Sequence, residues 1–303
     1  MIKNINPIPF TKIFLFILIY KRLISLEKQI DYNLPIEFDL RKQYDYCESL
    51  QSIRNQGECG GCWAFAVTEV ISDRICIKSR GKNHTIVSPT ELITCCSNCF
   101  DPDSSKGCGG GYPSRSFQYW INHGLPTESC KSYKFHKSST FDNIKCSNTC
   151  DDGSKPEYYF GSDYQRIDID EKKIMNEIYL YGSVTANFEV YKDFDIYWKN
   201  NCQGIYEFTP VYKFETKHII KIIGWGKEIV NGKEVKYWLC ANSWGTDKCD
   251  GFFKFKKGVN YLGIETYVFA GYINSKIILR NKESIIVSED IFFCFKNLDK
   301  DFM

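Results

Sequence analysis

The spacing of apolar residues divides the chain into two parts with different periodicities. In the first part apolar residues recur at helical spacing, most clearly from Cys62 to about Ser79, and a glycine at position 81 can end that helix. Ser88-Pro89-Thr90-Glu91 resembles a capping box and predicts a short second helix over residues 92–95. A third helix, with Phe117 and Trp120 on its apolar face, is expected to end at residue 124.

The second part changes from a helical pattern to a strand pattern. Residues 169–180 have helical periodicity and are followed by Gly182. Beyond it β-branched and aromatic residues dominate five runs that we expect to be strands: 184–190, 218–223, 237–241, 252–255 and 266–269. The pattern therefore predicts an α+β protein with a helical domain, a sheet or barrel domain and a cleft between them.

We place the domain boundaries where this character changes. Residues 34–163 are assigned mainly to the helical domain, although 34–45 is expected to cross to the other domain, and 34–53 is predicted to be strand and connector. Residues 164–271 are assigned to the sheet or barrel domain, and 272–303 to a C-terminal extension. Residues 1–33 are interpreted as a signal-like segment with a short remnant of a pro-region.

The charge balance disfavours two classes of partner, and the N-terminus points to a secreted protein. The 303 residues contain 39 Lys and Arg against 37 Asp and Glu, which gives no reason to expect a nucleic acid or an anionic membrane as partner. Lys12 precedes an apolar run over 13–20, which has the length of a signal-peptide core and is too short to span a bilayer. No small-residue cleavage site follows, so a wrongly assigned start of the coding sequence is the alternative.

Cysteine is the most informative residue type. The chain has 15 cysteines, clustered in its first half, which favours an oxidising compartment and leaves at least one thiol unpaired because the count is odd. Asn83-His84-Thr85 is a glycosylation sequon. The alternative for Cys96, Cys99, Cys146 and Cys150 is a zinc site, which the long spacing between the two pairs disfavours.

Cys62 is the candidate nucleophile. It stands at the start of the longest predicted helix, where unsatisfied N–H groups favour a thiolate over a thiol. Gly60 and Gly61 allow close approach to it, and Gln56 supplies an amide N–H for a developing oxyanion. For a lone cysteine a purely structural role would be the more common one.

Among the four histidines, His218 is the best general base and acid. It opens an apolar strand, whereas the other three lie in the sequon, at a polar helix end and in an irregular loop. Asn242 follows another predicted strand and can orient the imidazole, and Trp244 can shield the pair from water. Gly110 and Gly111, in a run of three glycines, are candidates for a wall along which an extended peptide binds.

These residues together resemble the papain family of cysteine proteases. Gln56, Cys59-Gly60-Gly61-Cys62-Trp63, His218 and Asn242-Ser243-Trp244 occur in that family's order, with Gly61 where the motif has Ser or Ala. Several phrases between residues 34 and 271 are similar to the cathepsin B branch. By that resemblance we expect the disulfides Cys47–Cys76, Cys59–Cys108, Cys95–Cys146, Cys96–Cys99 and Cys130–Cys150, with Cys62 free.

The resemblance also implies an activity. Cys62 would attack a peptide carbonyl, Gln56 and the Cys62 backbone N–H would hold the oxyanion, and His218 would protonate the leaving amine. It implies no cofactor and no metal, peptide or protein substrates, cystatin-type inhibitors, a monomer, and a lysosomal, digestive-vacuole or extracellular location. The alternative is a catalytically silent relative that serves as a binding or matrix protein.

Departures from cathepsin B suggest how specificity differs. The stretch 131–145, which corresponds to that branch's occluding loop, is short, has no cysteine and contains only His136, so we expect an endopeptidase and not a carboxydipeptidase. Tyr267 replaces an acidic residue in the pocket for the residue one before the cleaved one, which favours apolar or aromatic side chains there. A second tryptophan of the family is replaced near Lys248 and Cys249, and no long propeptide precedes residue 34.

Overall fold

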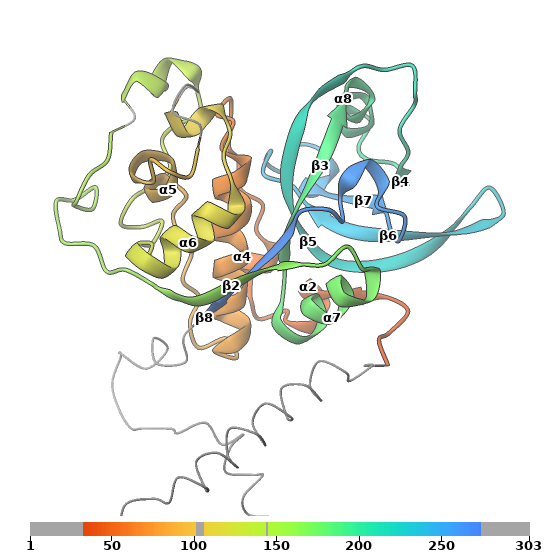
Figure 1. Cartoon of the computed structure of the whole chain (residues 1–303), viewed down its shortest axis with the longest axis horizontal. Helices are drawn as coiled ribbons and strands as arrows, with labels where there is room; N and C mark the ends of the chain where they lie inside the picture. The colour runs from red at the N-terminus through yellow and green to blue at the C-terminus, as the bar shows by residue number, and fades with distance from the viewer. Residues whose placement is uncertain (1–32, 101–105, 144, 274–303) are drawn as a thin grey trace, which may run out of the picture. The chain divides into compact units, whose positions relative to one another are not determined.

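The computed structural model describes residues 33–100, 106–143 and 145–273, and the described residues from Ile36 onward belong to one compact unit (Figure 1). Its helices are α2 Leu40–Gln43, α3 Glu48–Gln51, α4 Cys62–Lys78, α5 Thr90–Cys95, α6 Pro113–His123, α7 Glu171–Tyr181 and α8 Lys192–Lys199, with 3₁₀ turns η1 Lys106–Gly109, η2 Ser138–Asn143, η3 Cys249–Gly251 and η4 Tyr261–Gly263. Its strands are β1 Phe38–Asp39, β2 Gly161–Ile167, β3 Val184–Tyr191, β4 Ile205–Tyr206, β5 Phe214–Val230, β6 Lys233–Ala241, β7 Phe252–Lys256 and β8 Val268–Ile273.

Helix α4 is the centre of the helical part. All residues from Cys62 to Cys76 are buried, as expected for a helix that is surrounded by protein on every side. Trp63 and Phe65 pack in one core with Phe117 and Trp120 of α6. Figure 1 shows α4, α5 and α6 on one side of the unit and strands β3, β5, β6 and β7 on the other. The start of α4 is therefore fixed by its surroundings.

The strands form one sheet in the order β2-β8-β3-β5-β6-β7-β4, and β1 pairs with β5 outside this path. All of these pairs are antiparallel except β4 with β7. A cluster of aromatic rings, including Phe188, Phe194, Phe253 and Phe255, fills the space between the sheet and α8. The α+β architecture expected from the sequence is confirmed by this arrangement.

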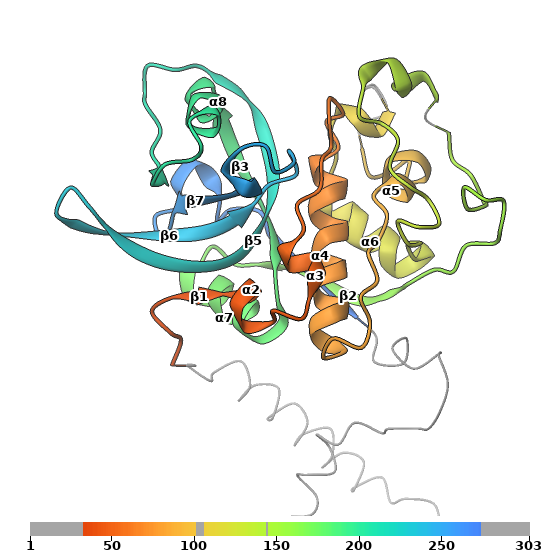
Figure 2. The same cartoon turned by 180° about the vertical axis from the view of Figure 1, so that it is seen from behind.

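Ionic contacts lock α4 to the sheet. The Lys221 ammonium on β5 lies 2.9 Å from the Asp73 carboxylate, and both side chains are completely buried. Arg74 lies 2.9 Å from Glu177 of α7 and donates to the backbone oxygen of Ser183 at 2.8 Å. Breaking such a pair leaves an uncompensated buried charge, so these contacts keep the helix in a fixed position against β5. Figure 2 shows α4 beside β5 from behind.

Disulfide bonds hold the loops of the helical part. The structure contains the five pairs that the resemblance implies, and it adds Cys202–Cys249, for which the sequence suggested no partner. Since the four cysteines considered for zinc lie in three of these bonds, no thiolate among them remains to bind a metal. Among the described residues, Cys62 and Cys240 are the cysteines outside disulfides.

Several local predictions were incomplete or wrong. Residues 34–53 form only a two-residue strand, followed by α2 and α3. The capping box before α5 is absent because the Glu91 carboxylate pairs with Lys131 at 2.5 Å, while Ser88 Oγ accepts from the Thr90 N–H. Strand β2 and helix α8 were not predicted. The signal-like segment, the cysteine at position 294 and most of the C-terminal extension lie outside the described residues.

Candidate active site

Cys62 is the first residue of α4, as the sequence predicts. Its side chain is buried and unpaired, and the backbone N–H groups of Cys62 and Trp63 at the helix start point to its sulfur. The backbone N–H of Ile219 on β5 also faces this sulfur and lowers the pKa of the thiol. Because Ile219 follows His218 directly, this contact brings the thiol beside the strand that carries the histidine.

His218 lies inside β5, which begins four residues earlier than expected. Its Nε2 is 2.8 Å from Asn242 Oδ1, and Asn242 follows the last residue of β6. The Trp244 ring lies 4.8 Å from the imidazole at an interplanar angle of 32°, and the Phe188 ring meets it edge-on at 5.9 Å. The hydrogen bond fixes one ring nitrogen, so Nδ1 is the nitrogen left for proton transfer.

Gln56 is held by contacts on every side. Its Oε1 accepts from Ser243 Oγ at 2.6 Å, and its Nε2 donates to the Cys59 backbone oxygen at 2.8 Å. The Tyr133 hydroxyl donates to the Gln56 backbone oxygen at 2.7 Å. An amide nitrogen carries two hydrogens, so one N–H of Gln56 is left over after the contact with Cys59.

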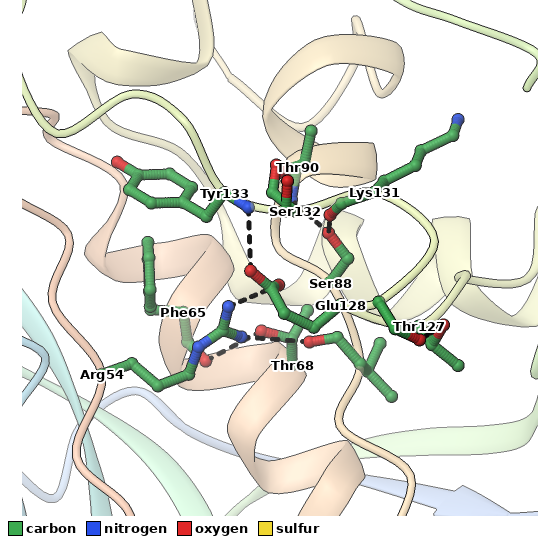
Figure 3. Close-up of polar contacts among 12 residues, drawn as sticks. Arg54, Phe65, Thr68, Ser88, Thr90, Thr127, Glu128, Lys131, Ser132 and Tyr133 are labelled. Carbon is green, nitrogen blue, oxygen red and sulfur yellow. Dashed lines mark hydrogen bonds and ion pairs between the residues drawn. The ribbon is translucent and has the colours of Figure 1, made fainter. Parts of the chain in front are cut away.

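A polar cluster supports the segment that carries Gln56. Figure 3 shows the Arg54 guanidinium between the Phe65 ring and the Glu128 carboxylate, which it meets at 2.5 Å. Arg54 also donates to the backbone oxygen of Val87 at 3.1 Å, and the Tyr133 backbone N–H donates to Glu128 at 2.8 Å. Sequence analysis missed this cluster, because its members are far apart along the chain.

Burial acts in opposite directions on the two titrating groups. It raises the pKa of the Cys62 thiol to about 11, although the backbone N–H groups around the sulfur oppose this. It lowers the pKa of the His218 imidazole to about 4, which the hydrogen bond that His218 donates to Asn242 Oδ1 opposes. Either charge alone is therefore unfavourable in this site. A thiolate and an imidazolium form most readily together, by proton transfer from one group to the other.

The glycines near Cys62 differ in their surroundings and in what a side chain at each position would contact. The Gly60 N–H donates to the Cys108 oxygen at 2.9 Å. A Cβ at Gly61 would lie 3.2 Å from Ile93 and 3.3 Å from Cys59, both tight contacts with side-chain atoms, so Ser or Ala there requires a small shift of these neighbours. Gly110 has a positive φ of 104°, and no described atom lies within 4 Å of the place of a Cβ, so its backbone faces open space.

Gly111 and Tyr267 differ in their surroundings. A Cβ at Gly111 would lie 2.5 Å from the Trp63 ring, so this glycine is required for packing. Tyr267 precedes β8 and is 46% exposed. The Arg166 guanidinium lies 4.8 Å from the centre of its ring, a contact that no local sequence pattern indicates.

The other candidate residues lie away from this group. His84, in the sequon, contacts the sulfur of Cys76, and His123 stacks on Tyr119 at the end of α6. His136 is exposed, and its backbone oxygen accepts from the Glu58 N–H at 2.9 Å. Asn83 lies in the turn after α4, where its side chain accepts from Thr85. None of these side chains contacts Cys62 or His218 in the described structure.

No helix in the described part of the chain combines the length and apolar character needed to cross a membrane. Within the same residues, no group of three or more His, Cys, Asp or Glu is arranged to hold a metal ion.

Comparison with known proteins identifies the class. The model of the papain family cysteine protease matches residues 34–272, and the chain belongs to this family. It is therefore a papain-type cysteine peptidase, a hydrolase that acts on peptides.

Individual relatives narrow this to the cathepsin B-like group. A "Cathepsin B-like cysteine proteinase" of Schistosoma japonicum is 35% identical over 271 residues, covering 81% of this chain and 75% of the relative. A "Gut-specific cysteine proteinase" of Caenorhabditis elegans is 38% identical over 256 residues, covering 79% of this chain and 74% of the relative. The solved structure of "proCathepsin B S9 from Trypanosoma congolense" is 31% identical, covers 82% of this chain and 81% of that one, and superimposes with a TM-score of 0.71.

Proposed function

We propose that the protein is an endopeptidase that cleaves peptide bonds with Cys62 as nucleophile, His218 as general base and acid, and Asn242 as the residue that orients His218. The observation that carries this proposal is the 2.8 Å contact between His218 Nε2 and Asn242 Oδ1, on the strand whose next residue, Ile219, faces the Cys62 sulfur.

The reaction starts with transfer of the Cys62 proton to His218 Nδ1. The thiolate then adds to the substrate carbonyl carbon, and His218 returns the proton to the amine as the carbon–nitrogen bond breaks. Water, deprotonated by His218, releases the acid from the acyl-enzyme and regenerates the thiol. Because burial opposes each charge alone, the ion pair exists mainly when both partners are in contact, which couples nucleophile formation to the position of His218.

Two donors stabilise the oxyanion of the tetrahedral intermediate. One is the backbone N–H of Cys62 at the N-terminus of α4, where the helix dipole also favours negative charge. The other is the remaining N–H of the Gln56 amide, which Ser243 and Cys59 hold in a fixed orientation. Such donors are effective because they are already oriented before charge develops.

The loop 131–145 supports internal cleavage over removal of C-terminal dipeptides. It has no cysteine to anchor a flap, and its single histidine is exposed, with its backbone tied to Glu58. The backbone N–H of Ser138 donates to the Glu58 carboxylate at 2.8 Å, which ties this loop to the segment between Gln56 and Cys62. Endopeptidase action requires that this short loop leave the cleft open for chain on both sides of the cleaved bond.

Tyr267 sets the preference for the residue one before the cleaved one. Its exposed ring offers an aromatic surface, and the Arg166 guanidinium above it places positive charge where cathepsin B has an acidic residue. An arginine side chain of the substrate would be repelled there, whereas an apolar or aromatic one can pack on the ring.

The protein is proposed to act in the secretory route, in a lysosome or digestive vacuole or outside the cell. The six disulfides support an oxidising compartment, and Asn83 lies in a turn that glycosylation can reach. Cystatin-type proteins are the proposed inhibitors, since they bind along the same kind of cleft.

Cleavage of matched peptides tests the proposal. Two internally quenched peptides of the same sequence, one with a free C-terminal carboxylate and one amidated, should be cut at the same internal bond and at similar rates. The Cys62→Ser variant should cut neither. Dipeptide release that requires the free carboxylate would contradict the endopeptidase assignment, and absence of cleavage by the wild type would favour the silent binding protein.

A further inference from the structure

The Trp244 ring, which covers His218, packs against two aromatic side chains of helix α8. Trp198 of α8 meets the Trp244 ring edge-on at 5.3 Å and 85°, and Phe194 of the same helix lies 5.8 Å from it. Trp244 in turn lies 4.8 Å from the imidazole. A continuous chain of ring contacts therefore runs from Trp198 through Trp244 to His218, although Trp198 does not touch the histidine.

A disulfide bond joins α8 to the loop that begins at Trp244. Cys202 follows the end of α8 and is bonded to Cys249 in η3. The Cys202 N–H donates to the Tyr197 oxygen at 3.0 Å, and the sulfur of Cys249 lies 3.6 Å from the Trp198 backbone oxygen. The helix that supports Trp244 and the loop that carries it are thus linked covalently.

The backbone at both ends of this bond is strained. Cys202 has a φ of 46° and Cys249 a φ of 59°, and their neighbours Asn201 and Asp250 have φ of 57° and 49°. Asparagine and aspartate adopt this left-handed region more readily than other residues, so the strain lies at the two cysteines, which adopt it where the surrounding structure forces them. The fold therefore tolerates an unfavourable backbone conformation at the point where α8 and η3 are joined.

We propose that Trp198 and the Cys202–Cys249 disulfide are positioning elements of the active site, which hold Trp244 against His218 and keep water from the His218–Asn242 hydrogen bond. The inference rests on the proposed role of His218. Trp198 and the disulfide touch no reacting atom and act through Trp244. If Trp198 is removed, Trp244 loses its edge contact and can move from the imidazole, which lets water compete for Asn242.

The pKa of His218 reports directly how well Trp244 shields the imidazole from water. Within the described residues, the aromatic rings beside the imidazole belong to Trp244 and Phe188. The nearest ionisable residues on the neighbouring elements are Cys62 at the start of α4, Lys217 next to His218 on β5, and Glu189 on β3, whose backbone pairs with Lys217. Burial is what lowers this pKa, so a wetter site raises it toward the ordinary value of histidine. A role in folding stability alone would leave it unchanged.

NMR titration of histidine-labelled full-length protein tests the inference, in a Cys62→Ser background that removes the thiol from the titration. Trp198→Leu should raise the His218 pKa by about one unit or more, and Cys202→Ser with Cys249→Ser should shift it in the same direction by less. Trp198→Phe should keep the wild-type value. Matched controls are Trp120→Leu, which removes a fully buried indole from α6, and Cys130→Ser with Cys150→Ser, and both should leave the pKa unchanged.

An unchanged His218 pKa in Trp198→Leu and in the disulfide variant would overturn the inference, as would an equal rise in the two controls. If Trp198→Leu does not fold, the disulfide variant decides by itself: a raised His218 pKa supports the inference, and an unchanged pKa overturns it. The titration needs no turnover, so its failure is distinct from failure of the proposed function, which would show as a wild-type protein whose Cys62 does not react with a thiol-protease inhibitor.

Discussion

Replacing Gln56 by alanine removes one proposed oxyanion donor and leaves the thiol and imidazole in place. One N–H of the amide is used by the Cys59 oxygen at 2.8 Å, and the other is free for the substrate oxyanion. Loss of one such donor typically lowers kcat by about 10²–10³, equivalent to about 2.7–4 kcal/mol of transition-state stabilisation. The two lost side-chain hydrogen bonds cost about 1–3 kcal/mol of folding stability, which a domain of ordinary stability tolerates.

The assay is steady-state cleavage of a fluorogenic peptide, combined with thermal unfolding of each variant. Gln56→Ala should have a strongly reduced kcat and a nearly unchanged KM, because the donor acts on charge that develops after binding. Gln51→Ala is the matched control, since Gln51 is an exposed glutamine on α3 whose amide donates to the Arg41 oxygen at 2.9 Å. Equal kcat values for the two variants would refute the assignment of Gln56.

Three further changes test other parts of the account. Burial raises the pKa of Glu69 to about 7, against the attraction of Lys221, so the folded state holds a proton that the unfolded state releases between about pH 4.5 and 7. This contribution to stability, on the order of 3 kcal/mol, is present below pH 4.5 and is lost as pH rises through 7. In Glu69→Gln, the free energy of unfolding measured with denaturant should therefore vary less with pH over that range. A pH dependence equal to that of the wild type would contradict the assignment to Glu69. Tyr267→Glu should shift a peptide-library profile toward arginine at the position before the cleaved residue, whereas a wild-type profile already dominated by arginine would refute the role of Tyr267. Glu128→Gln weakens the ion pair with Arg54, which supports the segment that carries Gln56, and should lower kcat by about tenfold while inhibitor labelling of the Cys62 thiol is retained. An unchanged kcat would show that the Arg54–Glu128 pair does not position Gln56.

The features that could be predicted from sequence are those with local causes. Helix α4 begins at Cys62 and ends before Gly81 because apolar spacing and a C-terminal glycine act within the segment itself. Asn242 was found because it directly follows a strand and has a side chain able to orient an imidazole. The family motif then connected these residues across the chain.

Features that depend on distant partners could not be predicted. Lys221 lies within an apolar run and is fully buried, because Asp73 on α4 compensates its charge, and nothing near Lys221 in sequence indicates that partner. Helix α8 is short and its apolar residues are aromatic or β-branched, a pattern that local spacing does not distinguish from a strand. The Cys202–Cys249 bond requires knowing that α8 and η3 meet.

Mapping of an irreversible thiol-protease inhibitor by mass spectrometry tests the central claim most directly. Cys62 and Cys240 are the free cysteines of the described residues, and both are buried, with burial raising the pKa of Cys240 well above its usual value. We predict a single adduct on Cys62, lost in Cys62→Ser and strongly reduced in His218→Ala, with Cys240 unmodified. An adduct on Cys240, or labelling of Cys62 that does not depend on His218, would contradict the account.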